Sequence, residues 1–362
     1  MFLALREIRH QPARFLLITI VVVLVSYLAF FLTGLAYGLA SAYSEAIRNW
    51  SASGVVTTST ANQNLMASRL SARQLEVASE QAPAAAPLLL QAVVYVPAAG
   101  QEERANAYLF AVDEAGPAAP AVTEGRYPRA GGEILLDATL AREGFALGSQ
   151  VQLADSDTTW QVVGFTDAQR FQTAPVMYVS IDQYRDRFGY LLAGRDGEVA
   201  AHAVVLGPNA TPDAAALEEA GLEYLSSDAL ISALPGYNAQ VLTFSLMIGS
   251  LIGIATLVLA IFIYVLTLQK RSLFGIMKAQ GIRTSYIVVS GAVQTFFLTM
   301  VGVGIGLALA FGTSVALAGK VPFAVSPVLF AGVIGAFLLG TVIGGLVPIR
   351  TISRIDPIEA IG

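Results

Sequence analysis

The chain has 362 residues, of which 55% are hydrophobic and only 13% are charged. Soluble domains average about 25% charged residues, so this composition excludes an ordinary soluble enzyme and predicts a membrane protein. The formal net charge of −5 argues against a nucleic-acid-binding protein. Because the chain has no cysteine, disulfides and thiolate metal sites are excluded.

Four long stretches without a charged residue predict the membrane spans. They contain 30, 41, 36 and 29 residues, and a spanning helix needs about 20 apolar residues. An alternative for the first stretch, a cleaved signal peptide, fits poorly because its apolar part exceeds the 7–15 residues of a signal core. We therefore expect four transmembrane helices, at 15–42, 241–268, 285–316 and 326–349.

The distribution of Lys and Arg predicts the orientation of these helices. Nine of the 21 basic residues lie at the two chain ends or between the second and third spans, which the positive-inside rule places in the cytoplasm. Residues 1–14 mix apolar and basic side chains and predict an interfacial helix. The sequence thus predicts cytoplasmic segments at 1–14, 269–284 and 350–362, an extracytoplasmic domain at 43–240 and an outer loop at 317–325.

The segment 43–240 mixes strand-like and helical patterns, so we expect an α+β extracytoplasmic domain between the first two helices. Its only histidine, His202, lies in a strand-like run and is interpreted as a strand residue rather than a ligand. The expected strands are 55–59, 88–96, 107–112, 133–136, 150–153, 160–165, 177–180 and 200–206. The expected helices are 70–80, 138–143, 181–188 and 212–220.

The chain contains no phosphate-binding loop of the G-x-x-x-x-G-K-[ST] type. The predicted spans also contain no Asp, Glu, Lys or Arg, which disfavours a proton-driven transporter. Any energy for transport would therefore come from another subunit. The basic, amphipathic segment 269–284, with Gly281 suited to end a helix, is either a docking helix for that subunit or a plain connection.

Several motifs in order along the chain resemble one family of transporters. They are Arg-Ser-Leu-Phe-Gly-Ile-Met-Lys-Ala-Gln-Gly at 271–281, Ala-Leu-Arg-Glu-Ile-Arg at 4–9, Gly-Glu-Ile-Leu-Leu at 132–136, Val-Val-Gly-Phe at 162–165, and Arg-Ile-Asp-Pro-Ile-Glu-Ala-Ile at 354–361. Together they are similar to the motifs of the MacB/FtsX-type ABC transporter permeases. A further similar run is Gly-Ser-Gln-Val-Gln-Leu at 148–153, which departs from the family at Ser149, where Asp is usual.

This resemblance implies a homodimeric permease in the cell membrane that works with two copies of a separate cytoplasmic ATPase. ATP would be bound and hydrolysed by that partner, so the chain itself would not be an enzyme and would need no cofactor of its own. Closure of the ATPases would be transmitted mechanically to the outer domains. The resemblance implies coupling residues in 269–284, namely Arg271, Phe274, Met277, Lys278 and Gly281.

Within the family, the chain is most similar to the heme-exporting branch, which implies heme as the substrate. Export of drugs, peptides or lipids is an alternative, as is a signalling permease that activates an extracellular cell-wall hydrolase.

A candidate heme site lies on the first span. Gly34, Gly38, Ser41 and Glu45 fall on one helix face, and small residues at this spacing allow two helices to approach closely. Two copies would bring two Glu45 carboxylates together above this gap, where Glu45 could bind the heme iron. Tyr37, Tyr43, Tyr237, Phe244 and Met247 are the candidate walls. The simpler interpretations are that Glu45 is an interfacial charge and that the tyrosines form an aromatic belt.

Overall fold

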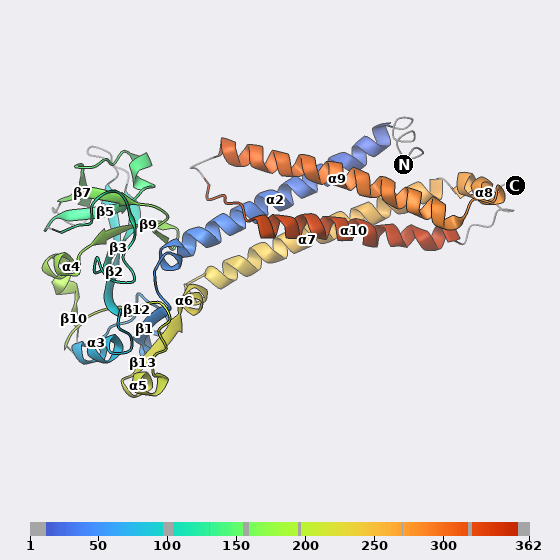
Figure 1. Ribbon diagram of the computed structural model, residues 1–362. Helices are drawn as coiled ribbons and strands as arrows, with labels where there is room; N and C mark the ends of the chain where they lie inside the picture. Colours follow the sequence, from blue (N-terminus) through green and yellow to red (C-terminus); the bar gives the residue numbers. More distant parts are fainter. Residues whose placement is uncertain are drawn as a thin grey trace. The chain divides into compact units, whose positions relative to one another are not determined.

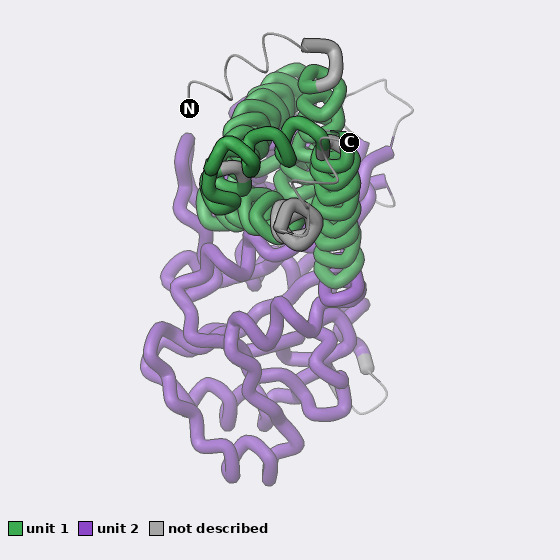
Figure 2. Tube along the Cα trace, turned by 90° about the vertical axis from the view of Figure 1, so that its right-hand side faces the viewer, with its two compact units in different colours: residues 1–39, 241–362 green, residues 40–240 purple. Residues whose placement is uncertain are grey.

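The computed structural model describes residues 12–96, 104–129, 131–154, 159–194, 197–269, 271–317 and 321–353. The chain forms two compact units (Figure 2). Residues 1–39 and 241–362 form the first, which we call the membrane unit, and residues 40–240 form the second, which we call the inter-span unit. The predicted interfacial helix at 1–14 falls almost wholly outside the described residues, as does the C-terminal tail after Ser353.

The membrane helices are α2 (Pro12–Arg48), α7 (Tyr237–Gln269), α9 (Thr284–Ala316) and α10 (Pro327–Ser353), with the short α8 (Arg271–Ala279) between α7 and α9. Among the described residues, these four long helices are apolar enough to cross a membrane, which confirms the four predicted spans. Helix α2 continues six residues beyond the predicted end of its span at 42, so Tyr43 and Glu45 are helical.

Glycines allow the membrane helices to pack closely. A Cβ on Gly302 of α9 would lie 2.7 Å from Val22 of α2, and one on Gly306 would lie 2.2 Å from the Ser26 hydroxyl. Bare backbone at these positions lets α9 approach α2. Helices α9 and α10 are joined by a hydrogen bond of 3.0 Å between the Thr341 and Thr299 hydroxyls.

A mixed sheet forms the centre of the inter-span unit (Figure 1). Its strand order is β13-β1-β12-β2-β3-β9-β5-β7-β4, while β6 pairs with β2 and β7, and β8 pairs with β9. The pairs β3–β9 and β5–β7 are parallel, and the other pairs of this sheet are antiparallel. The strands are β1 (Gly54–Thr58), β2 (Ala86–Val96), β3 (Ala105–Ala111), β4 (Val122–Gly125), β5 (Glu133–Asp137), β6 (Gln150–Leu153), β7 (Thr159–Thr166), β8 (Arg170–Phe171), β9 (Ala174–Val179), β12 (Ala203–Leu206) and β13 (Leu222–Ser226).

The helices of this unit are short. They are α3 (Ala72–Ser79), α4 (Ile181–Phe188), α5 (Ala214–Glu219) and α6 (Ser227–Ala233), with 3-10 turns at Ser59–Ala61, Leu140–Glu143 and Gly189–Leu191, and a small hairpin of β10 (Ala193–Gly194) and β11 (Gly197–Glu198). All eight predicted strands have a counterpart, and the α+β prediction is confirmed. The predicted helix at 138–143 is a 3-10 turn, and β4, β8, β10, β11, β13 and α6 were not predicted.

Alternation along β2 builds a core on each face of the sheet. Leu88 and Leu90 pack with Phe110 and Tyr178 in one core. Leu89, Val93 and Tyr95 pack with Trp160 in the second core. Both faces of the sheet are therefore covered, as the period of two along a strand requires.

The strand that follows α2 pairs directly with the strand that leads toward α7. Strands β1 and β13 are antiparallel, with Gly54 opposite Ser226 and Thr58 opposite Leu222. Because β1 also pairs with β12 on its other side, it is an interior strand rather than an edge.

Candidate functional site

Helix α8 is the structural counterpart of the predicted docking segment 269–284. It ends in a Schellman motif, in which Ile282 donates its main-chain N–H to Met277 and Gly281 donates to Lys278, at 3.0 and 2.9 Å. Gly281 has a φ of 84°, a conformation that glycine adopts without steric cost. The glycine therefore ends the helix at a defined residue.

Helix α8 exposes two large apolar side chains. Leu273 is 51% exposed and Ile276 is 43% exposed, and their spacing of three residues places them on one helix face. Phe274, Met277 and Lys278 are half-buried. Gly281, also predicted as a coupling residue, is exposed, and Leu273 and Ile276 were not among the predicted residues. Their i, i+3 spacing was the signal that could have identified them.

The two glycines of the predicted seam pack against the chain's own 321–325 segment. A Cβ on Gly34 would lie 2.2 Å from the Phe323 ring, and one on Gly38 would lie 1.9 Å from the Pro322 carbonyl oxygen. Ala324 also donates its N–H to the Gly34 carbonyl at 3.1 Å. This packing within one chain accounts for both glycines without a second copy.

Phe323 joins an aromatic cluster beside these glycines. Its ring stacks on Phe31 at 5.9 Å between centroids and meets Phe330 edge-on at 6.5 Å. Tyr37 and Met247, also in the membrane unit, are exposed, and Phe244 is half-buried. None of these three shares a hydrogen bond or ring contact with Phe323 among the described residues.

Four further candidates, Ser41, Tyr43, Glu45 and Tyr237, belong to the inter-span unit. Two of them meet: the rings of Tyr43 and Tyr237 lie 6.1 Å apart, and the Tyr43 hydroxyl donates to the Pro235 carbonyl at 3.1 Å. Ser41 is half-buried. The structure therefore brings together two of the predicted wall residues, which lie 194 positions apart in the sequence.

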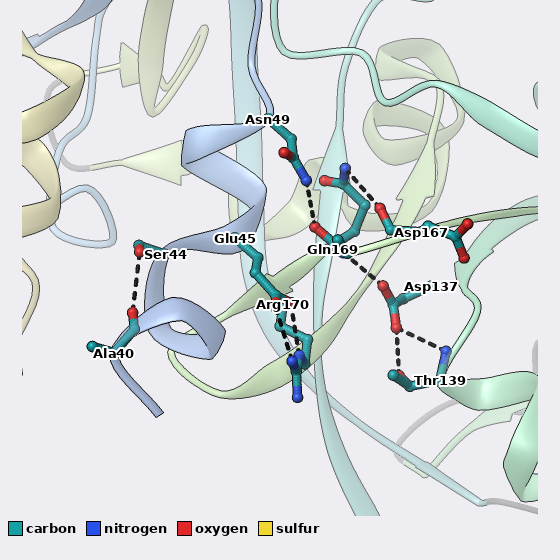
Figure 3. A network of polar contacts seen from close by, with 10 residues as sticks. Ala40, Ser44, Glu45, Asn49, Asp137, Thr139, Asp167, Gln169 and Arg170 are labelled. Carbon is teal, nitrogen blue, oxygen red and sulfur yellow. Dashed lines mark hydrogen bonds and ion pairs between the residues drawn. The ribbon is translucent and has the colours of Figure 1, made fainter. Parts of the chain in front are cut away.

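Glu45 already has a cationic partner (Figure 3). Arg170 of β8 donates through Nε at 2.7 Å and through Nη2 at 2.8 Å to its two carboxylate oxygens. The hydrogen bond to Glu45 raises the pKa of the Arg170 guanidinium above its ordinary value. Sequence reasoning missed Arg170, which lies 125 positions away with no local signal.

The β8–β9 hairpin holds the last turns of α2 at further points. Gln172 and Thr173 donate main-chain N–H groups to the Tyr43 and Ala42 carbonyls, at 3.0 and 3.2 Å. The Asn49 amide donates to the Ala168 carbonyl at 2.7 Å. We call residues 168–173 the hairpin clamp, because they bind α2 through main-chain and side-chain groups on successive turns.

The hairpin clamp has an unusual backbone. Ala168, Gln172 and Thr173 have φ values of 53°, 48° and 72°, and non-glycine residues adopt this left-handed region at a cost. For Gln172 and Thr173, the hydrogen bonds to α2 offset part of that cost. The clamp is therefore a specifically built joint rather than a loose loop.

A buried polar group supports the clamp from the sheet side. Asp137 of β5 accepts the Gln169 N–H at 2.6 Å and the Thr139 N–H at 2.9 Å. The Gln169 side chain in turn accepts a hydrogen bond from the Tyr178 hydroxyl at 2.6 Å. Burial raises the pKa of Tyr178, so this hydroxyl remains a donor. The position of the clamp is thus set by the core of the sheet.

The described residues contain no cluster of three His, Asp or Glu side chains that could hold a metal ion. His202 is buried, and its Nδ1 accepts the Leu90 N–H at 3.2 Å. Burial, with Arg69 nearby, lowers its pKa to about 4.

Comparison with known proteins identifies the family. The MacB-like periplasmic core domain matches residues 15–218, and the FtsX-like permease C-terminal domain matches residues 245–357. The chain belongs to the MacB/FtsX family of ABC transporter permeases. Permeases of this family are membrane subunits that work with a cytoplasmic ATPase, so the ATPase activity resides in a partner subunit rather than in this chain.

Two curated relatives and one solved structure are similar to this chain. A hemin transport system permease protein named HrtB, from Staphylococcus epidermidis, is 28% identical over 100% of this chain and 99% of its own length. The pyoverdine export protein PvdT of Pseudomonas fluorescens is 36% identical over 33% of this chain and 19% of its own. The solved periplasmic region of MacB from Actinobacillus actinomycetemcomitans aligns with 52% of this chain and 95% of its own, at 12% identity and a TM-score of 0.36.

Proposed function

We propose that this permease exports hemin from the membrane, driven by two copies of a separate ATPase. The observation that carries this proposal is the end-to-end similarity to a permease named for hemin transport, which spans both the membrane helices and the inter-span unit. The pyoverdine exporter, in contrast, matches only a third of the chain.

In this proposal, the ATPases act on α8 from the cytoplasm. The apolar side chains Leu273 and Ile276 are exposed there, and apolar area of this kind contributes to a protein–protein contact when it is covered. The Schellman motif at Gly281 gives α8 a fixed end. Because few residues separate α8 from α9, a movement of α8 would be passed on to α9. The Lys and Arg distribution supports the proposal that α8 and both termini lie in the cytoplasm.

Movement would pass outward through α2. The hairpin clamp grips the last turns of α2 through the Glu45–Arg170 ion pair and the main-chain bonds to Ala42 and Tyr43. Asp137 and Gln169 connect the clamp to the buried sheet. This series of bonds suits the mechanical transmission that we propose in place of a proton or ion relay.

The proposed hemin site lies on the outer half of α2 of a homodimer. The candidate residues are Tyr37, Ser41, Tyr43 and Glu45 of α2, with Tyr237, Phe244 and Met247 of α7. Because the 321–325 segment of the same chain already packs against Gly34 and Gly38, hemin binding at these two glycines would require that segment to move aside. Tyrosine and carboxylate oxygens are hard ligands suited to ferric iron. Since Arg170 donates to both Glu45 oxygens, iron binding by Glu45 would compete with that ion pair.

Hemin binding and hemin export are tested separately. The permease and its ATPase are purified together in lipid nanodiscs and titrated with hemin, and we expect a saturable Soret shift and a change in ATP turnover. Cells that express the pair should tolerate more hemin than cells with a hydrolysis-deficient ATPase. If no Soret shift is seen and the cells instead tolerate another toxic compound, that compound would be the substrate in place of hemin. Specific retention of a cell-wall hydrolase, with no export, would support the signalling alternative.

A further inference from the structure

Strand β2 has a gap along one of its edges. Toward its start it pairs with β12, with Leu88 opposite Ala203. Toward its end it pairs with β6, with Tyr95 opposite Leu153. Residues 91–94 between these pairings have a described strand partner, β3, on one side only. The gap is therefore a short open edge within an otherwise paired strand.

Two main-chain groups at this edge, both on Ala92, have no partner in the described part of the chain. On the gap side, Leu88 accepts from His202, Leu90 donates to the His202 ring and Val94 accepts from Ala154. Since strand residues alternate in direction, Ala92 also points its N–H and C=O into the gap. Ala92 is exposed, and neither group has a partner on that side among the described residues. An N–H and a C=O on one residue, both open, are the pair that another strand satisfies.

A cavity of about 380 Å³ lies against this edge. It is lined by Val93 of β2, Leu153 of β6, Trp160 of β7 and Phe188 of α4, which are buried. The indole N–H of Trp160 is buried without an acceptor. The cavity falls within the usual volume range of ligand pockets and accommodates one large side chain.

The rim of the cavity combines exposed apolar side chains with a cation. Tyr190 and Leu191 line the cavity, and their side chains are exposed, at 74% and 51%. Arg187 lies over the Trp160 ring, 5.5 Å from its centroid, and is the one charged residue among those that line the cavity in the described structure. Its charge is opposite to that of the surrounding segment 43–240, which has 23 acidic and 11 basic residues.

We propose that the β2 edge and this cavity bind a short extended segment of a partner protein. The segment would pair with the main chain of Ala92, insert an apolar side chain beside Trp160 and Phe188, and place a carboxylate near Arg187. A small molecule could fill the cavity, but the open N–H and C=O of Ala92 together match a peptide main chain. The rim charge selects an acidic segment over a basic one. This inference is independent of the hemin proposal.

The test uses the full-length permease in nanodiscs and a display library of hexapeptides with alternating apolar residues. We expect enriched sequences to carry Asp or Glu beside an apolar residue. The best peptide should lose at least tenfold in affinity with Ala92→Pro, which removes the N–H, and should keep its affinity with Ala92→Ser. Arg187→Gln should weaken binding severalfold, whereas Arg185→Gln, on the same helix but away from the cavity, should have no effect.

A second measurement tests the same contact without depending on whether the Ala92→Pro variant folds. The same peptide is methylated on the main-chain nitrogen of alternate residues and titrated against the unaltered protein. One of the two methylation patterns should abolish binding, because it removes the donor that faces Ala92. No enrichment over empty nanodiscs would overturn the proposal. So would a peptide that tolerates both methylation patterns and Ala92→Pro.

Discussion

Arg170 donates to both carboxylate oxygens of Glu45, at 2.7 and 2.8 Å, and so joins the β8–β9 hairpin to the end of α2. The pair is largely sheltered, with 18% of the Glu45 side chain and 29% of the Arg170 side chain exposed. Bidentate pairs of this kind fix orientation as well as adding free energy. The residue that we first considered as an iron ligand is therefore also a structural connection.

The stability of this connection can be measured by a double-mutant cycle. Glu45→Gln and Arg170→Gln should each lower the free energy of unfolding of the inter-span unit by about 1–3 kcal/mol, because each leaves one charge unpaired. The double variant should lose less than the sum of the two. Urea unfolding followed by tryptophan fluorescence suits this measurement, since Trp50 and Trp160 both lie in that unit. Additive losses would mean that the two side chains do not stabilise each other.

Hemin titration of the same variants separates the two roles of Glu45. If the carboxylate binds iron, Arg170→Gln should keep or strengthen the Soret shift, because the competing cation is gone, while Glu45→Gln should abolish it. Equal loss in both variants would assign Glu45 to the joint alone and remove it from the hemin site. His202→Asn is the control, since that side chain is buried in the sheet and should not affect binding.

The close contact at Gly38 predicts sensitivity to added bulk. Gly38→Leu should destabilise the membrane unit by more than about 3 kcal/mol, because even a Cβ would lie 1.9 Å from the Pro322 carbonyl oxygen. Gly312→Leu adds the same bulk where no atom lies within 4 Å. Thermal unfolding in detergent should separate the two variants clearly. Similar losses in both would show that bulk anywhere in a span is harmful and that the 321–325 contact is unimportant.

A charge introduced on helix α8 tests docking. Leu273→Asp should weaken association with the ATPase about tenfold or more, since it places a charge on the exposed apolar face. Gln280→Glu adds a negative charge to an exposed position just after α8 and should change association little. Co-purification and transport-linked ATP turnover give the readouts. Normal coupling in Leu273→Asp would leave α8 as a connector.

His202 predicts a pH dependence of the inter-span unit. Its folded pKa of about 4 lies below the model-peptide value of 6.5, so the unfolded state takes up a proton first as the pH falls. Stability should therefore decline from pH 6.5 toward pH 4, by up to about 1.4 kcal/mol per pH unit. His202→Asn should flatten this slope while keeping an acceptor for the Leu90 N–H. An unchanged slope in that variant would assign the acid sensitivity to carboxylates.

Local features were predictable from the sequence, and non-local ones were not. Uncharged stretches located the four spans because lipid tolerates few charges. The Lys278–Gly281 segment suggested a helix end because glycine suits a positive φ. The Glu45–Arg170 pair has no such signal, since β8 is two residues long and far along the chain. Nor do Ala168, Gln172 and Thr173 signal a left-handed turn, a position where glycine or asparagine is expected.

The pairing of β1 with β13 limits how force can act on the inter-span unit. Gly54 and Ser226, the residues nearest α2 and α6, face each other at the same end of the ladder. A pull that drew these two ends apart would break the ladder one hydrogen-bonded pair at a time, the weakest geometry for antiparallel strands. A force that moved both ends together would not act on any single hydrogen-bonded pair of the ladder. The unit is therefore built to be lifted or turned as one body, whereas splaying of its two connections would have to break the Tyr43–Pro235 hydrogen bond as well as this ladder.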